Sequence, residues 1–146
     1  MAETAQQSFE NHTRIVPAYH MGAFGIFLIN LLWSLYRLAK YPSAETVVSL
    51  LLAVGFLLLF FYARIFALTV QDRVIRLEMQ LRLRQMLPAD LQARIAELTP
   101  KQLIAMRFAS DDELPGLCRA VLNDKTMEQK AIKKMIKNWR PDHLRA

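Results

Sequence analysis

Two long apolar stretches, close together in the first half of the chain, constrain its fold more than any other feature. The first covers residues 21–36 and the second covers residues 46–62. The second carries no charged residue, and the next charge along the chain is Arg64. At about 1.5 Å per helical residue, the second stretch is just long enough to cross the hydrocarbon core of a bilayer. Only residues 37–45 separate the two stretches, and Pro42 among them suits a tight reversal. The sequence therefore predicts a transmembrane helical hairpin.

The predicted fold class is all-α: this hairpin, then a long helix and a small cytoplasmic helical bundle. We divide the chain into an N-terminal segment (residues 1–20), the two-span hairpin (residues 21–70) and a basic helical domain (residues 71–146). Of the 19 Lys and Arg, 15 follow residue 70, together with 10 of the 13 acids, so this last part has a net charge of +5. Because Lys and Arg concentrate on the cytoplasmic side of membrane proteins, both termini are expected in the cytoplasm.

The first apolar stretch is interpreted as a retained membrane span. A cleaved signal peptide begins with a short positive region. Here twenty residues precede the apolar stretch, and they include Glu3 and Glu10.

Asn30 is the polar outlier of the first apolar stretch. If the hairpin turns near residue 41, residues whose numbers add to about 83 lie at equal depth, so Ser34 is expected opposite Ser49. Asn30 is likewise expected opposite Ala53. Small residues opposite polar ones permit close packing and an interhelical hydrogen bond, so we predict that these four residues pack the hairpin. Alternatively, Asn30 lines a substrate or ion pathway, although the spans offer it no partner charge.

Residues 70–87 are expected to form one helix, because they lack Gly and Pro and are rich in strong helix formers. The apolar and polar residues alternate from residue 75 to 83 as in a strand, but the segment leaves the second apolar stretch without a breaker. On a helical wheel, its apolar residues form two stripes. One is Val70, Val74, Leu77 and Leu81. We predict that the bundle buries one stripe and that self-association uses the other: Ile75, Met79, Leu83 and Met86.

Pro88 ends this helix, and short helices are expected to follow. Residues 90–98 form the first. Thr99 and Gln102 then have the spacing of a capping box, in which each side chain bonds the other residue's backbone N–H. Pro100 occupies the first helical position, where its fixed φ is favourable.

Asp111 is expected to cap the next helix, because this cap places Pro115 in the tolerated first turn. That helix is expected to bury five side chains: Leu114, Leu117, Cys118, Val121 and Leu122. As the only cysteine, Cys118 cannot form a disulfide within the chain, and it is interpreted as a small core residue.

Residues 126–139 are expected to form a final amphipathic helix, capped at Thr126 and ended by Pro141. One face is apolar, and the other is basic: Lys130, Lys133, Lys134 and Lys137. A basic face is commonly just solvated. Its functional interpretations are attraction to anionic lipid headgroups or contact with nucleic acid. A membrane tether favours lipid, and no aromatic residues alternate with the lysines to suggest base recognition, so nucleic acid is the weaker alternative.

Sequence motifs for catalysis are missing. There is no phosphate-binding glycine loop, no His-Glu-x-x-His pair and no paired cysteines. The histidines are His12, His20 and His143, and we interpret the first two as polar anchors near the inner membrane interface rather than metal ligands. We therefore predict a non-enzymatic protein without a metal or other cofactor.

Three segments carry a resemblance to a known family: Asn11-His12-Thr13-Arg14 with Pro17-Ala18-Tyr19-His20, Arg107-Phe108-Ala109-Ser110-Asp111, and Ile136-Lys137-Asn138-Trp139-Arg140. The chain resembles an uncharacterised family of small bacterial two-helix membrane proteins, which has no assigned activity. The resemblance implies a protein of the bacterial cytoplasmic membrane. It also implies a candidate functional cluster at the inner headgroup level: His12, Arg14, Pro17, Tyr19 and His20.

The expected function is that of a membrane-anchored interaction or scaffold protein, or a small subunit of a membrane assembly. Its expected partners are membrane lipids and either further copies of the chain or other subunits of a larger membrane complex. A small transport or channel component that uses Asn30 is one alternative. A membrane-tethered nucleic-acid binder is another.

Overall fold

A computed structural model describes residues 8–10 and 15–142 of the chain. The chain divides into two compact units, of which one is Arg14–Leu68 and the other combines Met1–Thr13 with Thr69–Ala146. We call the first unit the hairpin and the second the tail domain. The described residues are predominantly helical, which confirms the predicted all-α class, and one helix contributes to both units.

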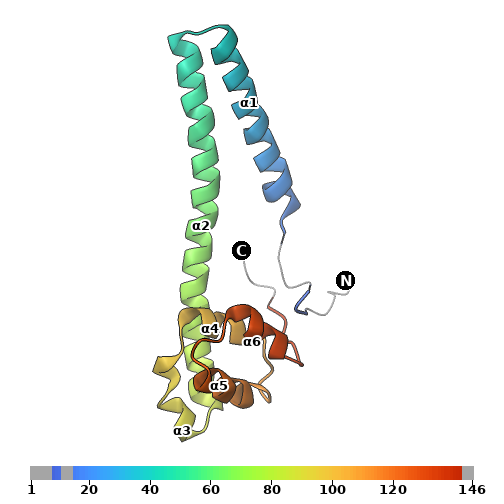
Figure 1. The fold of residues 1–146 in the computed structure, drawn as a ribbon, viewed down its shortest axis with the longest axis vertical. Helices are drawn as coiled ribbons and strands as arrows, with labels where there is room; N and C mark the ends of the chain where they lie inside the picture. Colours follow the sequence, from blue (N-terminus) through green and yellow to red (C-terminus); the bar gives the residue numbers. More distant parts are fainter. Residues whose placement is uncertain (1–7, 11–14, 143–146) are drawn as a thin grey trace. The chain divides into compact units, whose positions relative to one another are not determined.

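The hairpin pairs two antiparallel helices (Figure 1). A π-helical turn, η1 (Ala18–Ala23), leads into α1 (Phe24–Lys40), and α2 (Ala44–Met86) follows. Ser43 and Thr46 cap α2 reciprocally, because each side chain accepts a hydrogen bond from the backbone N–H of the other, at 3.2 and 3.0 Å. The Thr46 hydroxyl, which is buried, also donates to the carbonyl of Tyr41 at 3.1 Å. The reversal is therefore short and held by its own side chains.

The two helices of the hairpin meet along residues spaced alternately by three and four. Phe27 stacks on Phe56 with ring centroids 5.7 Å apart, and these residue numbers add to 83. Phe60 packs against Phe24 at 5.8 Å. The buried or half-buried positions on α1 include Phe24, Phe27, Leu31, Ser34 and Leu38, and those on α2 include Thr46, Leu50, Ala53, Leu57 and Phe60. This spacing is typical of helices that pack with a left-handed crossing.

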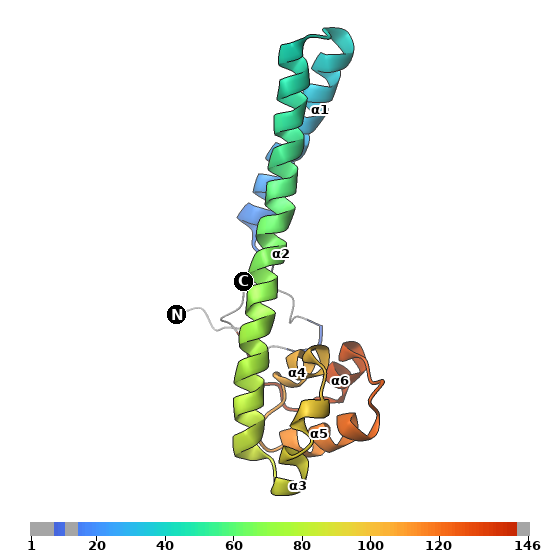
Figure 2. The ribbon, with the colours of Figure 1, turned by 90° about the vertical axis from the view of Figure 1, so that its left-hand side faces the viewer.

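In the tail domain, short helices pack against one side of the last part of α2 (Figure 2). These are α3 (Ala89–Gln92), the 3₁₀ turn η2 (Ile95–Glu97), α4 (Pro100–Met106), α5 (Leu114–Asn123) and α6 (Gln129–Met135). All five side chains predicted to be buried on α5 are buried, and Leu103, Met106 and Phe108 are fully enclosed with them. The tail domain thus has an apolar core of its own.

Of the helix caps predicted in the tail domain, one is confirmed and two are wrong. The capping box of Thr99 and Gln102 is confirmed. Asp111 is not a cap: Glu113 precedes α5, and the Asp111 carboxylate accepts a hydrogen bond from Arg82 instead. Thr126 is not a cap either. It lies three residues before the start of α6 at Gln129, and its hydroxyl donates to the Asp124 carboxylate.

The two apolar stripes of α2 have the opposite roles to those predicted. Ile75, Met79 and Leu83 are 5%, 3% and 0% exposed and lie in the core of the tail domain. They are therefore not available for self-association, and Met86, the fourth member, is at the end of the helix and 41% exposed. The other stripe faces outward. Both stripes consist of large apolar side chains, so the tertiary contacts of α3 to α6 decide which one is buried.

Candidate functional site

Asn30 does not face α2 as predicted. Its side chain is exposed, whereas Ser34 and Ala53 are buried and Ser49 is half-buried. The prediction grouped residues four apart, and such a stripe drifts by about 40° per step around a helix of 3.6 residues per turn. The observed interface alternates steps of three and four and stays on one face, so it passes beside Asn30 rather than through it. The amide of Asn30 makes no hydrogen bond with any described residue of the hairpin.

Tyr19 and His20 hold the start of the hairpin together. The Tyr19 hydroxyl donates to the Phe60 carbonyl at 2.5 Å, and its ring stacks on that of Phe60 at 4.3 Å. His20 Nδ1 lies 3.1 Å from the backbone nitrogen of Val16. These contacts are packing and local bonding within the hairpin. Pro17 is exposed beside them, and His12 and Arg14 lie outside the described residues.

A small apolar hollow of about 280 Å³ lies beside this cluster. Its walls come from the segment that leads into α1, including the turn η1, and from α2: Val16, Tyr19, His20, Ala63, Arg64 and Ala67. His20 and Arg64 border the hollow, but its lining is almost entirely apolar, so it offers little to a polar ligand.

Two of the segments that carry the family resemblance pair with each other in the tail domain. Ala109 and Trp139 form an antiparallel bridge. The Ser110 N–H donates to the Asn138 carbonyl at 3.1 Å, and the Arg140 N–H donates to the Phe108 carbonyl at 2.7 Å. This pairing ends α6 at Met135 and draws residues 136–140 out of the helix predicted to reach Trp139. These motifs therefore have a structural role, which is to close the tail domain.

Arg82 connects α2 to this closure, and sequence reasoning missed it. Its guanidinium donates to the carbonyls of Arg107 and Ala109 at 3.2 and 2.6 Å, and to the Asp111 carboxylate at 2.8 Å. The hydrogen bond from Arg82, with its charge, lowers the pKa of Asp111. The sequence signal is weak: Arg82 is one of the polar residues in the alternating segment 75–83, and nothing near it in the sequence marks its partners.

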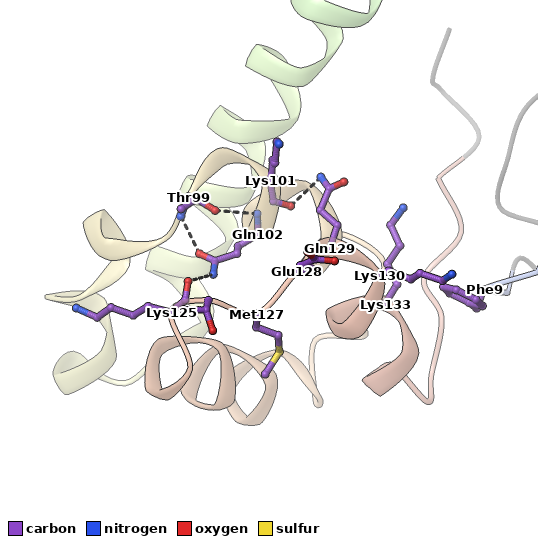
Figure 3. Close-up of a pocket in the computed structure, with 11 residues that line it drawn as sticks. Phe9, Thr99, Lys101, Gln102, Lys125, Met127, Glu128, Gln129, Lys130 and Lys133 are labelled. Carbon is purple, nitrogen blue, oxygen red and sulfur yellow. Dashed lines mark hydrogen bonds between the residues drawn. The ribbon is translucent and has the colours of Figure 1, made fainter.

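A basic groove of about 710 Å³ lies between the start of α4 and residues 125–133 (Figure 3). Its wall includes the Gln102 amide, which accepts from the Thr99 N–H at 2.9 Å and donates to the Lys125 carbonyl at 3.1 Å. Four lysines and one glutamate line it: Lys101, Lys125, Lys130, Lys133 and Glu128. The groove therefore has an excess of positive charge and offers ammonium donors to an anionic group.

The four lysines of the predicted basic face are only partly together. Lys130 and Lys133 line the groove. Lys134 lies over the ring of Phe9 at 5.8 Å. Lys137 follows the end of α6, and its backbone N–H donates to Glu113. The predicted face is therefore shortened to the three lysines on α6, because Lys137 lies beyond the end of that helix.

Cys118, the lone cysteine, lies buried in the core of the tail domain. Burial raises the pKa of the Cys118 thiol to about 11, so it remains protonated at neutral pH. Among residues 8–10 and 15–142, no group of three His, Cys, Asp or Glu side chains is arranged to hold a metal ion.

These features define an all-α protein in which an apolar helical hairpin precedes a small basic helical domain. The chain belongs to the Family of unknown function (DUF6526), whose sequence profile matches residues 1–146. No curated protein and no solved structure gives a significant match. The family assignment agrees with the resemblance to an uncharacterised family and adds no activity.

Proposed function

We propose that this chain is a membrane-anchored interaction protein of the bacterial cytoplasmic membrane, in which the hairpin crosses the bilayer twice and holds the tail domain at the cytoplasmic surface. The proposal is non-enzymatic: the tail domain binds another component of a membrane assembly. The basic groove would meet anionic headgroups or an acidic partner.

One observation carries the membrane anchor. The helices Ala18–Lys40 and Ala44–Met86 are long and apolar enough to cross a membrane, and only 6% and 17% of the residues in their most apolar windows are buried. A core helix of a water-soluble protein is mostly buried instead. Side chains such as Leu51, Leu59 and Phe66 are 65%, 66% and 64% exposed. Lipid would cover this surface without further protein.

Alkaline carbonate extraction tests the anchor. The full chain, expressed at low level, should stay with the membrane pellet and float with vesicles in a density gradient. A peripheral protein bound only through the lysines of the groove would be released by carbonate or by high salt. Release of most of the chain would overturn the anchor.

Pulldown in a mild detergent with mass spectrometry tests the interaction role. A matched variant, Lys101→Glu with Lys130→Glu, reverses the charge of the groove lining from +3 to −1 without touching the core. Partners recovered by the wild type and lost by this variant would support a groove-mediated interaction. Identical recovery by both would rule out the groove as the binding site.

A second candidate function, a small transport or channel component, is favoured by the position of Asn30. An exposed amide in the middle of an apolar span is costly in lipid unless a neighbour or a water-filled path satisfies it. Asn30→Leu separates the two functions. Under the interaction function it changes association or stability, and under the transport function it changes flux through reconstituted vesicles.

A further inference from the structure

The second half of α2 presents an apolar stripe whose side chains are about half exposed or more in the described tail domain. We call Val70, Val74, Leu77 and Leu81 the outer stripe; they are 61%, 48%, 61% and 61% exposed. We call Ile75, Met79 and Leu83 the core stripe. At about 100° per residue, the mean directions of the two stripes lie roughly 170° apart, so a partner on the outer stripe would not disturb the core.

The outer stripe lies beyond the part of α2 that a bilayer accommodates. A hydrocarbon core of about 30 Å takes roughly 20 helical residues, so a span that begins near Thr46 ends near Arg64. Asp72, Arg73 and Glu78 then interrupt the apolar surface, which a lipid-facing helix would not tolerate. Water or another protein therefore surrounds this stripe.

The spacing of the outer stripe is that of a two-stranded coiled coil. Steps of four, three and four place Val74 and Leu81 at a positions and Val70 and Leu77 at d positions of a heptad. The central layers combine a β-branched Val at a with a Leu at d, which favours a parallel dimer. Arg84 occupies the next d position and ends the seam.

The charges beside the seam are complementary in only one orientation. Arg73 is a g residue and Glu78 is an e residue, and both are exposed. In a parallel dimer, each g residue lies beside the e residue five positions later in the second copy, so Arg73 meets Glu78 twice by symmetry. An antiparallel pair centred on the same stripe would place Arg73 beside Gln80 and gain no ion pair. Neither charge has a hydrogen bond or ion pair with another described residue.

We propose that the outer stripe is the seam of a parallel homodimer, in which Val70, Val74, Leu77 and Leu81 pack against the same residues of a second copy. Two heptads are too short to hold free helices together. Here the helix is already ordered, because its core stripe is packed in the tail domain. Pairing then has no helix-forming entropy to overcome. A chain outside a membrane could form the same pair, so the dimer does not depend on the proposed anchor.

Cysteine crosslinking of the full chain tests both contact and orientation. Val70→Cys and Leu77→Cys should each give a disulfide-linked dimer under mild oxidation, because identical seam positions face each other in a parallel pair. In an antiparallel pair two copies of residue 70 would be roughly 16 Å apart, too far for a disulfide. Arg76→Cys, exposed on neither stripe, is the matched control. The native Cys118 is buried and should remain unlinked. Crosslinking of Val70→Cys no greater than that of Arg76→Cys would overturn the parallel dimer.

Exchanging the two charges tests the dimer in a second way, because recovery of dimerisation in the double variant cannot result from a folding defect. Arg73→Glu or Glu78→Arg should each weaken dimerisation roughly tenfold in sedimentation equilibrium, because two ion pairs become two repulsions. The double variant restores the pairs with reversed signs and should return dimerisation to within about twofold of wild type. Helicity by circular dichroism checks that each variant is folded. Failure of the double variant to recover would show that these two charges do not meet, and would contradict the proposed register.

Discussion

The hairpin and the tail domain use apolar residues in opposite ways. In the hairpin, large side chains such as Leu51 and Phe66 point outward, and a narrow line of aromatic contacts joins the two helices. In the tail domain, Leu103, Met106 and Phe108 are fully enclosed, and the ion pair of Arg119 with Asp90 lies at the surface. The same helix, α2, contributes to both regions. Apolar content alone therefore does not identify a core: what surrounds the side chain in each region decides its energetic role.

Phe108→Ala should destabilise the tail domain more than any other single change considered for the two regions. Phe108 is fully buried and packs on Trp139 at 4.8 Å, so truncation should reduce the free energy of unfolding by about 3–5 kcal/mol. Phe66→Ala, which trims an exposed ring of the hairpin, is the control and should leave the tail domain unchanged. Urea unfolding in detergent, followed by Trp139 fluorescence in a Trp33→Phe background, measures both. Equal losses for the two variants would contradict the distinction between core and exterior.

A charge in the apolar surface of the hairpin gives the next largest effect. Leu52 is 57% exposed, so in water Leu52→Arg would be almost neutral. In the middle of a membrane span it should disfavour insertion by about 2.5–3.5 kcal/mol. The measurement is the fraction of chain that floats with vesicles after cell-free synthesis. Leu77→Arg, equally exposed but beyond the span, is the control and should insert normally. Normal insertion of Leu52→Arg would mean that lipid does not meet this surface.

Loss of Arg82 should weaken the closure of the tail domain. Arg82→Ala leaves the carbonyls of Arg107 and Ala109 without their donor, so the free energy of unfolding should fall by roughly 1–3 kcal/mol. Arg84 is exposed and lies two residues later, so Arg84→Ala should change the free energy of unfolding by less than about 0.5 kcal/mol. Urea unfolding compares the two. A similar small loss for both would show that Arg82 does not hold the closure of residues 108 and 109 against α2.

The smallest effect is the pH dependence of one surface carboxylate. Hydrogen bonds from Arg94 and Lys125 lower the pKa of Glu97 from 4.5 to about 2. A carboxylate whose pKa is lower in the folded than in the unfolded protein stabilises the fold when the pH is above its unfolded-state pKa. This stabilisation is lost as the pH falls through about 4.5 toward 2. Melting temperatures of wild type and Glu97→Gln should therefore differ slightly at pH 6 and converge near pH 2. A constant difference across that range would assign the effect to something other than ionisation.

Local sequence patterns predicted the elements of this fold well. The two apolar stretches became the hairpin, and the Thr99 and Gln102 capping box begins α4 as expected. The apolar positions of α5 are all buried. Each of these depends on residues within one or two turns of each other, which is the range over which helical periodicity and capping act.

Features that depend on contacts between residues far apart in the sequence were predicted wrongly. The last helix ends early because Arg140 bonds to Phe108, and nothing near Arg140 in the sequence signals that partner. The choice between the two stripes of α2 depended on which face the later helices cover. Asn30 was misplaced because a constant step of four drifts away from the interface between two crossing helices. In each case the missing information was tertiary.

Measuring on which side of the membrane the hairpin loop and the tail domain lie tests the proposed anchor directly. Paired reporters, one active only outside the membrane and one only inside, would be fused after Ala146 and inserted in the loop at Pro42. The proposed arrangement predicts inside activity at Ala146 and outside activity at Pro42. Outside activity at Ala146, or inside activity at both sites, would contradict it.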